Sequence, residues 1–160
     1  MNLFRVSNLV FRVFLIIDSL LVTHYSKLND GILKDRNRVQ TRGRTILEGI
    51  EIARKAVEAA SEKQASDIVL LDVSKICTFA DYFVICSGDS ARQLSAIGDE
   101  VEHTLRDLGE HVIHHEGTAS SGWLLYDYTD VLVHIFGPDE RKFYQLEELW
   151  NQATPVIRIQ

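Results

Sequence analysis

Two groups of polar residues have types and spacings that could support nucleotidyl transfer. Ser87-Gly-Asp-Ser90 lies between an apolar run and a helical pattern, and a helix start offers free amides to a phosphate. Asp127 and Asp130, with Asp72, could supply carboxylates to Mg²⁺. The turn lacks the glycines and lysine of a phosphate-binding loop, and side chains three apart on one strand point to opposite faces. A capped turn therefore explains the first group better. A minimal nucleotidyltransferase-like enzyme that uses Asp127 and Asp130 with Mg²⁺ remains the alternative function.

A cluster of histidines could suggest a metal site. Alternation along a strand puts His111 and His115 on one face and His114 on the other, whereas a site needs three converging ligands. A solvated edge strand is the better interpretation, and we expect no metal and no cofactor. His134, within an apolar run, fits a hydrogen-bonded core histidine better than a catalytic base.

The residues expected around Trp123 favour a binding role for it. On residue type alone a core position is slightly favoured for Trp123, yet Trp and Tyr are the usual anchors of protein interfaces. We expect acidic residues, Asp81, Glu116, Asp127 and Asp130, to adjoin it. An aromatic anchor rimmed by acids suits a basic protein surface.

The elements that must position these residues are organised around one hairpin. Two β-favouring runs, 123–128 and 131–136, are separated by Thr129-Asp130, which predicts a two-residue turn. Apolar periodicity predicts helices from Ile46 to Lys63, with Thr45 and Glu48 as a capping box, and from about Asp89 or Ser90 to Gly109. Pro138 opens a last helix. The apolar face predicted for that helix comprises Phe143, Leu146, Leu149 and Trp150.

Further strands are predicted at 67–73, 80–87 and 111–115, so the element order is α-β-β-α-β-β-β-α. This order predicts an α/β fold: a single domain at 45–151, with a mixed five-stranded sheet flanked by helices, and a tail at 152–160. Residues 1–44 are expected to be poorly ordered, a targeting peptide or a non-native extension. Their apolar stretch, Leu9 to Val22, contains Arg12 and Asp18 and is too short to span a bilayer comfortably.

Charge divides the chain into two parts. Residues 1–44 carry eight Lys/Arg and three Asp/Glu, whereas residues 45–160 carry nine and twenty, a net charge of -11. Such an acidic domain argues against direct nucleic-acid readout and fits a basic protein partner, although many soluble domains are acidic and charge alone favours that ordinary interpretation. Two cysteines without metal-ligand spacing or a disulfide framework fit a reducing compartment, so we expect a cytoplasmic location, or an organellar one if residues 1–44 are a transit peptide.

Several motifs in one order resemble the ribosomal silencing factor family (RsfS, also called Iojap-like). They are 81–93 (DYFVICSGDSARQ), Glu116-Gly117, Gly122-Trp123, Asp127-Tyr128, Asp130-Val131 and Val133-His134, followed by matches in the last helix from Arg141 to Trp150. The resemblance spans about 46–150. Thr129 departs from it, because the family usually has glycine in this turn.

The resemblance implies a nucleotidyltransferase-like fold without the catalytic apparatus, and a translation repressor rather than an enzyme. Family members bind the large ribosomal subunit at its protein L-fourteen, block joining of the small subunit when nutrients are short, and are often homodimers; no membrane is involved. We therefore expect the partner surface to be formed or supported by Trp123, Tyr126, Asp127, Asp130, Asp81, Tyr82 and Glu116. The adjoining turn is expected to be shaped by Ser87, Gly88, Ser90 and Arg92.

Overall fold

The computed structural model describes residues 48–160, so the predicted N-terminal segment and Thr45 lie outside the described residues. Within this range the helices are α3 (Gly49–Glu62), α4 (Ala91–Asp107), α5 (Pro138–Tyr144) and α6 (Leu146–Leu149). The strands are β1 (Ser66–Asp72), β2 (Tyr82–Ser87), β3 (His114–Thr118), β4 (Trp123–Asp127), β5 (Val131–Phe136) and β6 (Thr154–Ile159), and a 3₁₀ turn, η1 (Ala119–Ser121), precedes β4. The predicted α/β class is confirmed.

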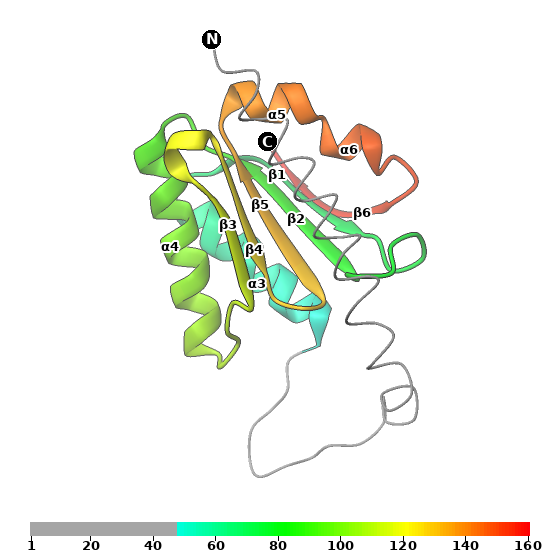
Figure 1. Ribbon diagram of the computed structural model, residues 1–160. Helices are drawn as coiled ribbons and strands as arrows, with labels where there is room; N and C mark the ends of the chain where they lie inside the picture. Colours follow the sequence, from blue (N-terminus) through cyan, green and yellow to red (C-terminus); the bar gives the residue numbers. More distant parts are fainter. Residues whose placement is uncertain (1–47) are drawn as a thin grey trace. The chain divides into compact units, whose positions relative to one another are not determined.

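The described strands form one mixed sheet in the order β3-β4-β5-β2-β1-β6 (Figure 1). Its β2–β5 pair is parallel, and its other pairs are antiparallel. The sheet has six strands rather than the predicted five, because β6 pairs with β1 where a tail was expected. Pro155 lies in β6, and an edge strand tolerates proline because one side of it donates no ladder hydrogen bonds.

Helices α3 and α4 pack together against one face of the sheet (Figure 1). Their buried alanines, leucines and valines meet Leu70, Val84, Val133 and Ile135 from the central strands. The helix α3 begins at Gly49, later than predicted, since Glu48 is extended and is itself the N-cap residue. The predicted ends of α4 are confirmed: the Ser90 hydroxyl accepts a hydrogen bond from the amide of Gln93, and Gly109 adopts a left-handed φ of 89°.

The β4–β5 hairpin has the predicted two-residue turn. Asp127 pairs with Leu132, and the amide of Tyr128 donates to the carbonyl of Val131, which leaves Thr129 and Asp130 at the tip. Thr129 has a φ of 73°, a conformation that a β-branched residue rarely adopts. The side chain of Asp127 holds this turn, since its Oδ1 accepts a hydrogen bond from the amide of Thr129 at 2.8 Å.

Two local predictions were wrong. The edge strand β3 begins at His114 rather than His111, because its register is set by pairing with β4, with Thr118 opposite Trp123. The last helix is divided at Gln145, whose φ is 43°, so that α5 and α6 replace the predicted single helix with one inward apolar face. Phe143 and Leu149, predicted to pack inward, are instead 74% and 68% exposed.

Candidate functional site

The face of the sheet opposite α3 and α4 carries a continuous set of aromatic rings, which we call the aromatic layer. Its members are Phe79, Phe83, Trp123, His134, Phe136, Tyr144 and Trp150. The ring of Trp123 lies 4.9 Å from that of Phe136 and 4.7 Å from that of Tyr144. The ring of Trp150 meets Phe83 edge-on at 5.2 Å, so α5 and α6 are attached to the sheet through aromatic contacts.

Trp123 belongs to this layer rather than to the hairpin tip. Only 4% of its surface is exposed, and it pairs with Phe136 at the opposite end of the hairpin from Asp127. A five-residue strand is about 15 Å long, so Trp123 and the tip carboxylates do not adjoin one another. The expectation of a single anchor with an acidic rim around Trp123 was wrong for this geometric reason.

The predicted acidic residues do gather at the tip end of the sheet. The carbonyl of Asp130 accepts hydrogen bonds from the amides of Asp81 (2.9 Å) and Tyr82 (3.0 Å). Burial, and then the negative charges of Asp72 and Asp81, raise the pKa of Tyr82. Burial also raises the pKa of Asp127, although its hydrogen bond from Thr129 partly opposes this. We call Asp81, Tyr82, Asp127 and Asp130 the acidic end.

Tyr126 lies on the opposite face of the sheet from Trp123, under α4. It is 3% exposed, and a Cβ added at Gly98 would collide with its hydroxyl. Burial, and then the charges of Asp99 and Glu102, raise its pKa to about 12. Tyr126 can therefore support the hairpin but cannot contact a partner directly. Glu116 lies half-buried on the edge strand β3, where its Oε1 is 2.9 Å from His114 Nε2.

The Ser87–Ser90 turn lies at the other end of β2. The buried hydroxyl of Ser87 is hydrogen-bonded by Arg141 Nη1 at 3.2 Å, and Ser90 caps α4. Side-chain carbon at Gly88 would lie 3.1 Å from Leu94 and Ile97, so this position suits glycine. Arg92 is exposed. These contacts are those of a tight strand-to-helix connection.

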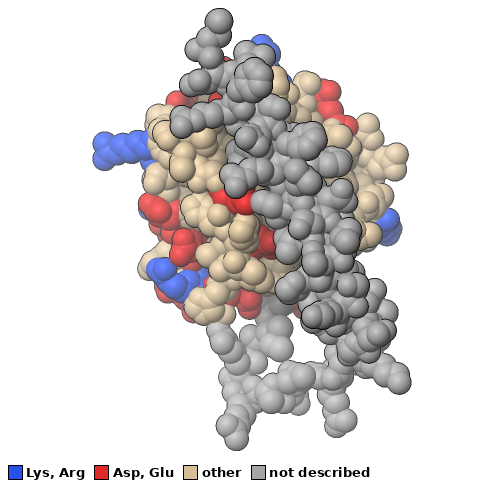
Figure 2. All heavy atoms as spheres, in the orientation of Figure 1, with Lys and Arg blue, Asp and Glu red and all other residues tan. Residues whose placement is uncertain are grey.

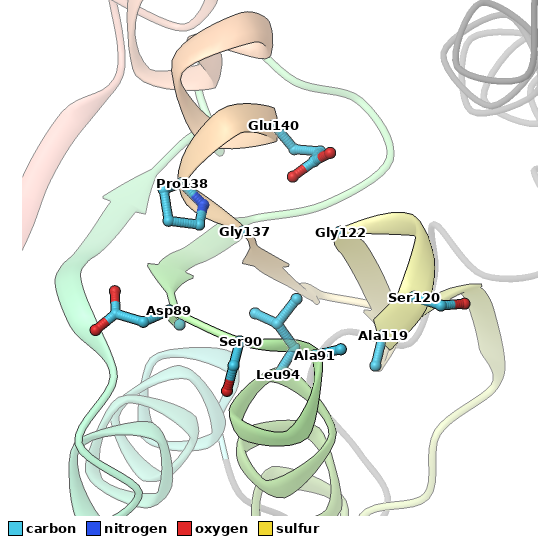
Figure 3. Close-up of a pocket in the computed structure, with 11 residues that line it drawn as sticks. Asp89, Ser90, Ala91, Leu94, Ala119, Ser120, Gly122, Gly137, Pro138 and Glu140 are labelled. Atoms are coloured by element: carbon cyan, nitrogen blue, oxygen red, sulfur yellow. The ribbon is translucent and has the colours of Figure 1, made fainter. Parts of the chain in front are cut away.

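A shallow cavity of about 210 Å³ opens beside this turn. Figure 3 shows Glu140 of α5 above Gly137 and Gly122, whereas the side chains of Asp89 and Ser90 point away from the cavity. The carboxylate of Glu140 lines the cavity near the start of α4, where a phosphate would need donors. The chemistry of this lining disfavours an anionic nucleotide.

His134 lies in the middle of the aromatic layer, 4% exposed, and neither of its ring nitrogens has a hydrogen-bond partner. The prediction of a buried core histidine is correct, but the prediction that it is hydrogen-bonded was wrong. Burial, and then the positive charge of Arg141, lower its pKa to about 3. Sequence reasoning missed the layer as a whole, since its rings come from segments that are distant along the chain.

Charge on the described surface is predominantly negative. Residues 48–160 contain the same nine Lys/Arg and twenty Asp/Glu counted above. Figure 2 shows acidic side chains spread over the described part of one face, with the basic ones near its margins. Among residues 48–160, no group of three or more His, Cys, Asp or Glu is placed to hold a metal ion, and no helix is both long and apolar enough to cross a bilayer.

Comparison with known proteins gives these features a context. A family model described as ribosomal silencing factor during starvation (RsfS) matches residues 47–160. This chain belongs to the RsfS family. The predicted resemblance is thus confirmed, and it covers the whole described domain.

Relatives of this RsfS protein occur in bacteria and in organelles. It is 42% identical to the ribosomal silencing factor RsfS of Bacillus subtilis over 102 residues, which cover 64% of this chain and 86% of that one. It is 37% identical to the chloroplastic protein Iojap of Zea mays over 112 residues (68% and 47%). It is 32% identical over 102 residues (59% and 43%) to a mouse protein named mitochondrial assembly of ribosomal large subunit protein 1.

A crystal structure from Chromobacterium violaceum has the same fold. It is 33% identical in sequence, with a TM-score of 0.64, over 71% of this chain and 95% of that one. The flanked mixed sheet of this RsfS protein is therefore shared with a solved structure.

Proposed function

We propose that this RsfS protein silences translation by binding the large ribosomal subunit at its protein L-fourteen and sterically blocking association with the small subunit when nutrients are limiting. The match of the RsfS family model to residues 47–160 carries this proposal. The name of the mouse relative supports the large subunit as the partner. In this proposal the chain is not an enzyme, because it acts by occupying a surface.

The charge of the domain supports a ribosomal protein as the contact. Ribosomal proteins are basic, and a domain with a net charge of -11 is attracted to such surfaces and repelled by phosphate backbones. The acidic end supplies exposed Asp81 and Asp130, which directly precede the central strands β2 and β5. We propose that these residues contact the partner together with Tyr82, Asp127 and Glu116, while the buried Trp123 and Tyr126 support the surface from within.

Cosedimentation with purified large subunits tests this proposal. The full chain should pellet with large subunits and should reduce the formation of joined ribosomes when small subunits are added. Raising the salt concentration should weaken binding, because attraction between exposed charges is screened. A chain that binds Mg²⁺ and a nucleoside triphosphate in calorimetry, and does not pellet with large subunits, would favour the enzymatic alternative instead.

Two exposed acids offer a matched pair of variants. Asp81→Lys, before β2, should weaken large-subunit binding several-fold, since a rim charge contributes modestly to affinity. Glu62→Lys, at the end of α3 on the other face of the sheet, makes the same change in net charge and should leave binding nearly unchanged. Equal effects of the two variants would indicate that net charge alone governs binding and that the acidic end is not the contact.

Location and assembly extend the proposal. The bacterial relative supports a cytoplasmic site of action, and the chloroplastic and mitochondrial relatives support an organellar one if residues 1–44 direct import. A homodimer is proposed from the family resemblance. Analytical ultracentrifugation of the full chain, at concentrations on both sides of those used for ribosome binding, tests that assembly.

A further inference from the structure

We propose that α5 and α6 form an apolar docking surface, anchored by Phe143 and Leu149, that seats in an apolar recess of a positively charged protein surface. The proposal rests on the proposed function and deepens it, since the partner is the protein component of the large subunit. It assigns the anchoring role to this segment rather than to Trp123, because only 4% of the surface of Trp123 is exposed and its ring is already packed within the aromatic layer.

Exposure of large apolar side chains is concentrated in this segment. Phe143 and Leu149 are 74% and 68% exposed, although they lie on consecutive helices that are otherwise attached to the sheet. Of the described residues, Ile113 is the other large apolar side chain with a comparable value, 67%, and it lies in the loop between α4 and β3. Single exposed apolar residues are ordinary, whereas two within seven residues of one segment that packs on the sheet through Tyr144 and Trp150 favour an interaction surface.

Contacts on the inner side of the segment hold the anchors outward. Arg141 donates from Nη1 to the Ser87 hydroxyl (3.2 Å), from Nη2 to the Asp67 carbonyl (3.0 Å) and from Nε to Glu147 Oε1 (3.0 Å). Tyr144 and Trp150 pack into the aromatic layer on the same side. Phe143 and Leu149 therefore cannot turn inward without breaking these contacts. A surface that is already ordered loses little conformational entropy when a partner binds.

The charges around the anchors identify the kind of partner. The exposed carboxylates of Asp139 and Glu148 lie on the same two helices, and Glu140 and Glu147 are half-exposed, whereas Lys142 is the exposed cation of this described segment. An acidic rim would repel an anionic membrane, nucleic acid or the same rim of a second copy. The surface is also continuous with the aromatic layer, since the Phe143 ring meets that of Tyr144 at 5.0 Å. A basic protein with an apolar recess satisfies both features.

The test compares the Phe143→Ala/Leu149→Ala double variant with Ile113→Ala as the matched control. Dissociation constants for purified large subunits are measured for the full-length chains, and thermal unfolding is recorded for each. The double variant should bind about 30-fold or more weakly, as expected when two anchors are truncated, while its Tm stays near that of the wild type because both side chains are exposed. Ile113→Ala should bind as the wild type does. Glu148→Lys should weaken binding several-fold.

Several results would overturn the proposal. Unchanged binding by a folded double variant would show that the surface is not used, and equal losses in Ile113→Ala would show that the effect is not specific to it. Wild-type dimers that become monomers in the double variant, or wild-type binding to phosphatidylglycerol vesicles that the variant lacks, would assign the surface to another occupant. Failure of the wild type itself to bind large subunits would refute the proposed function. This outcome is distinguishable from failure of the docking surface, because it is seen in the wild type and not in a variant.

Discussion

Replacing His134 by phenylalanine should make the domain less sensitive to acid. His134 is buried among aromatic rings, with Phe83 at 5.5 Å and Trp123 at 5.8 Å, and its nitrogens have no hydrogen-bond partner. Burial, and then the charge of Arg141, lower its pKa in the folded state to about 3, against 6.5 for an ordinary histidine. The folded-state pKa lies below the unfolded one, so the unfolded chain binds the proton first as the pH falls. Stability is therefore lost progressively from about pH 6.5 downward until pH approaches 3.

The size of the effect follows from the two pKa values. Between pH 7 and pH 5, protonation of His134 in the unfolded chain should remove about 2 kcal/mol from the free energy of unfolding, at roughly 1.4 kcal/mol per pH unit. His134→Phe removes this contribution and keeps a ring in the layer. At pH 7 the variant should be as stable as the wild type or more so, because an unpaired buried polar group is replaced by an apolar one.

Urea unfolding of both proteins at pH 7 and pH 5, at constant ionic strength, measures this difference directly. Carboxylates and the other histidines titrate in both proteins, so their effects cancel when the two pH dependences are subtracted. His111→Gln, which removes a histidine with an exposed side chain, serves as the control for the loss of a histidine. If His134→Phe loses as much stability as the wild type between the two pH values, the reasoning from burial is refuted.

Three further predictions can be tested by urea unfolding. Gly98→Ala should destabilise the domain by about 1–2 kcal/mol, because the new Cβ would lie 2.9 Å from Tyr126 Cζ; Tyr126→Phe should recover part of this loss, and additive losses would contradict the contact. Thr129→Gly should stabilise the hairpin by about 1 kcal/mol, since glycine accepts a φ of 73° without strain, and a net loss would count against strain there. Arg141→Lys should lower the free energy of unfolding by about 2 kcal/mol, because lysine cannot form the same set of hydrogen bonds to Ser87 and Glu147. An unchanged urea midpoint would show that the guanidinium hydrogen bonds contribute nothing to stability.

The sequence predicted best those elements whose pattern is local. The helix α4 has a full apolar stripe, a capping serine and a terminal glycine, and the β4–β5 hairpin has two β-favouring runs at a fixed spacing. Strands β3 and β6 lie at the edges of the sheet. An edge strand receives its register from its one neighbour, and β3 (HHEGT) has no alternation from which that register could be predicted.

The candidate site was predicted only in part, because its residues are combined by the topology rather than by sequence spacing. Asp81 and Asp130 meet through the parallel pairing of β2 with β5, which was not predicted. Trp123 and Asp127 are close in sequence but lie at opposite ends of one strand. The exposure of Phe143 and Leu149 accompanies the division of the last helix at Gln145, whose left-handed conformation no residue pattern indicates.

The parallel pairing at the centre of the sheet bears on how the domain folds. Strands β1 and β2 form one antiparallel group that is close along the chain, and β3, β4 and β5 form another. In the sheet these two groups pair with each other along β2 and β5, where Tyr82 lies beside Val131. Closing a loop of about fifty residues costs more conformational entropy than closing a hairpin, and it is therefore slower. The last step of folding is thus expected to be the pairing of two preformed groups of strands. When the domain opens, amide hydrogens between β2 and β5 should be the first to exchange.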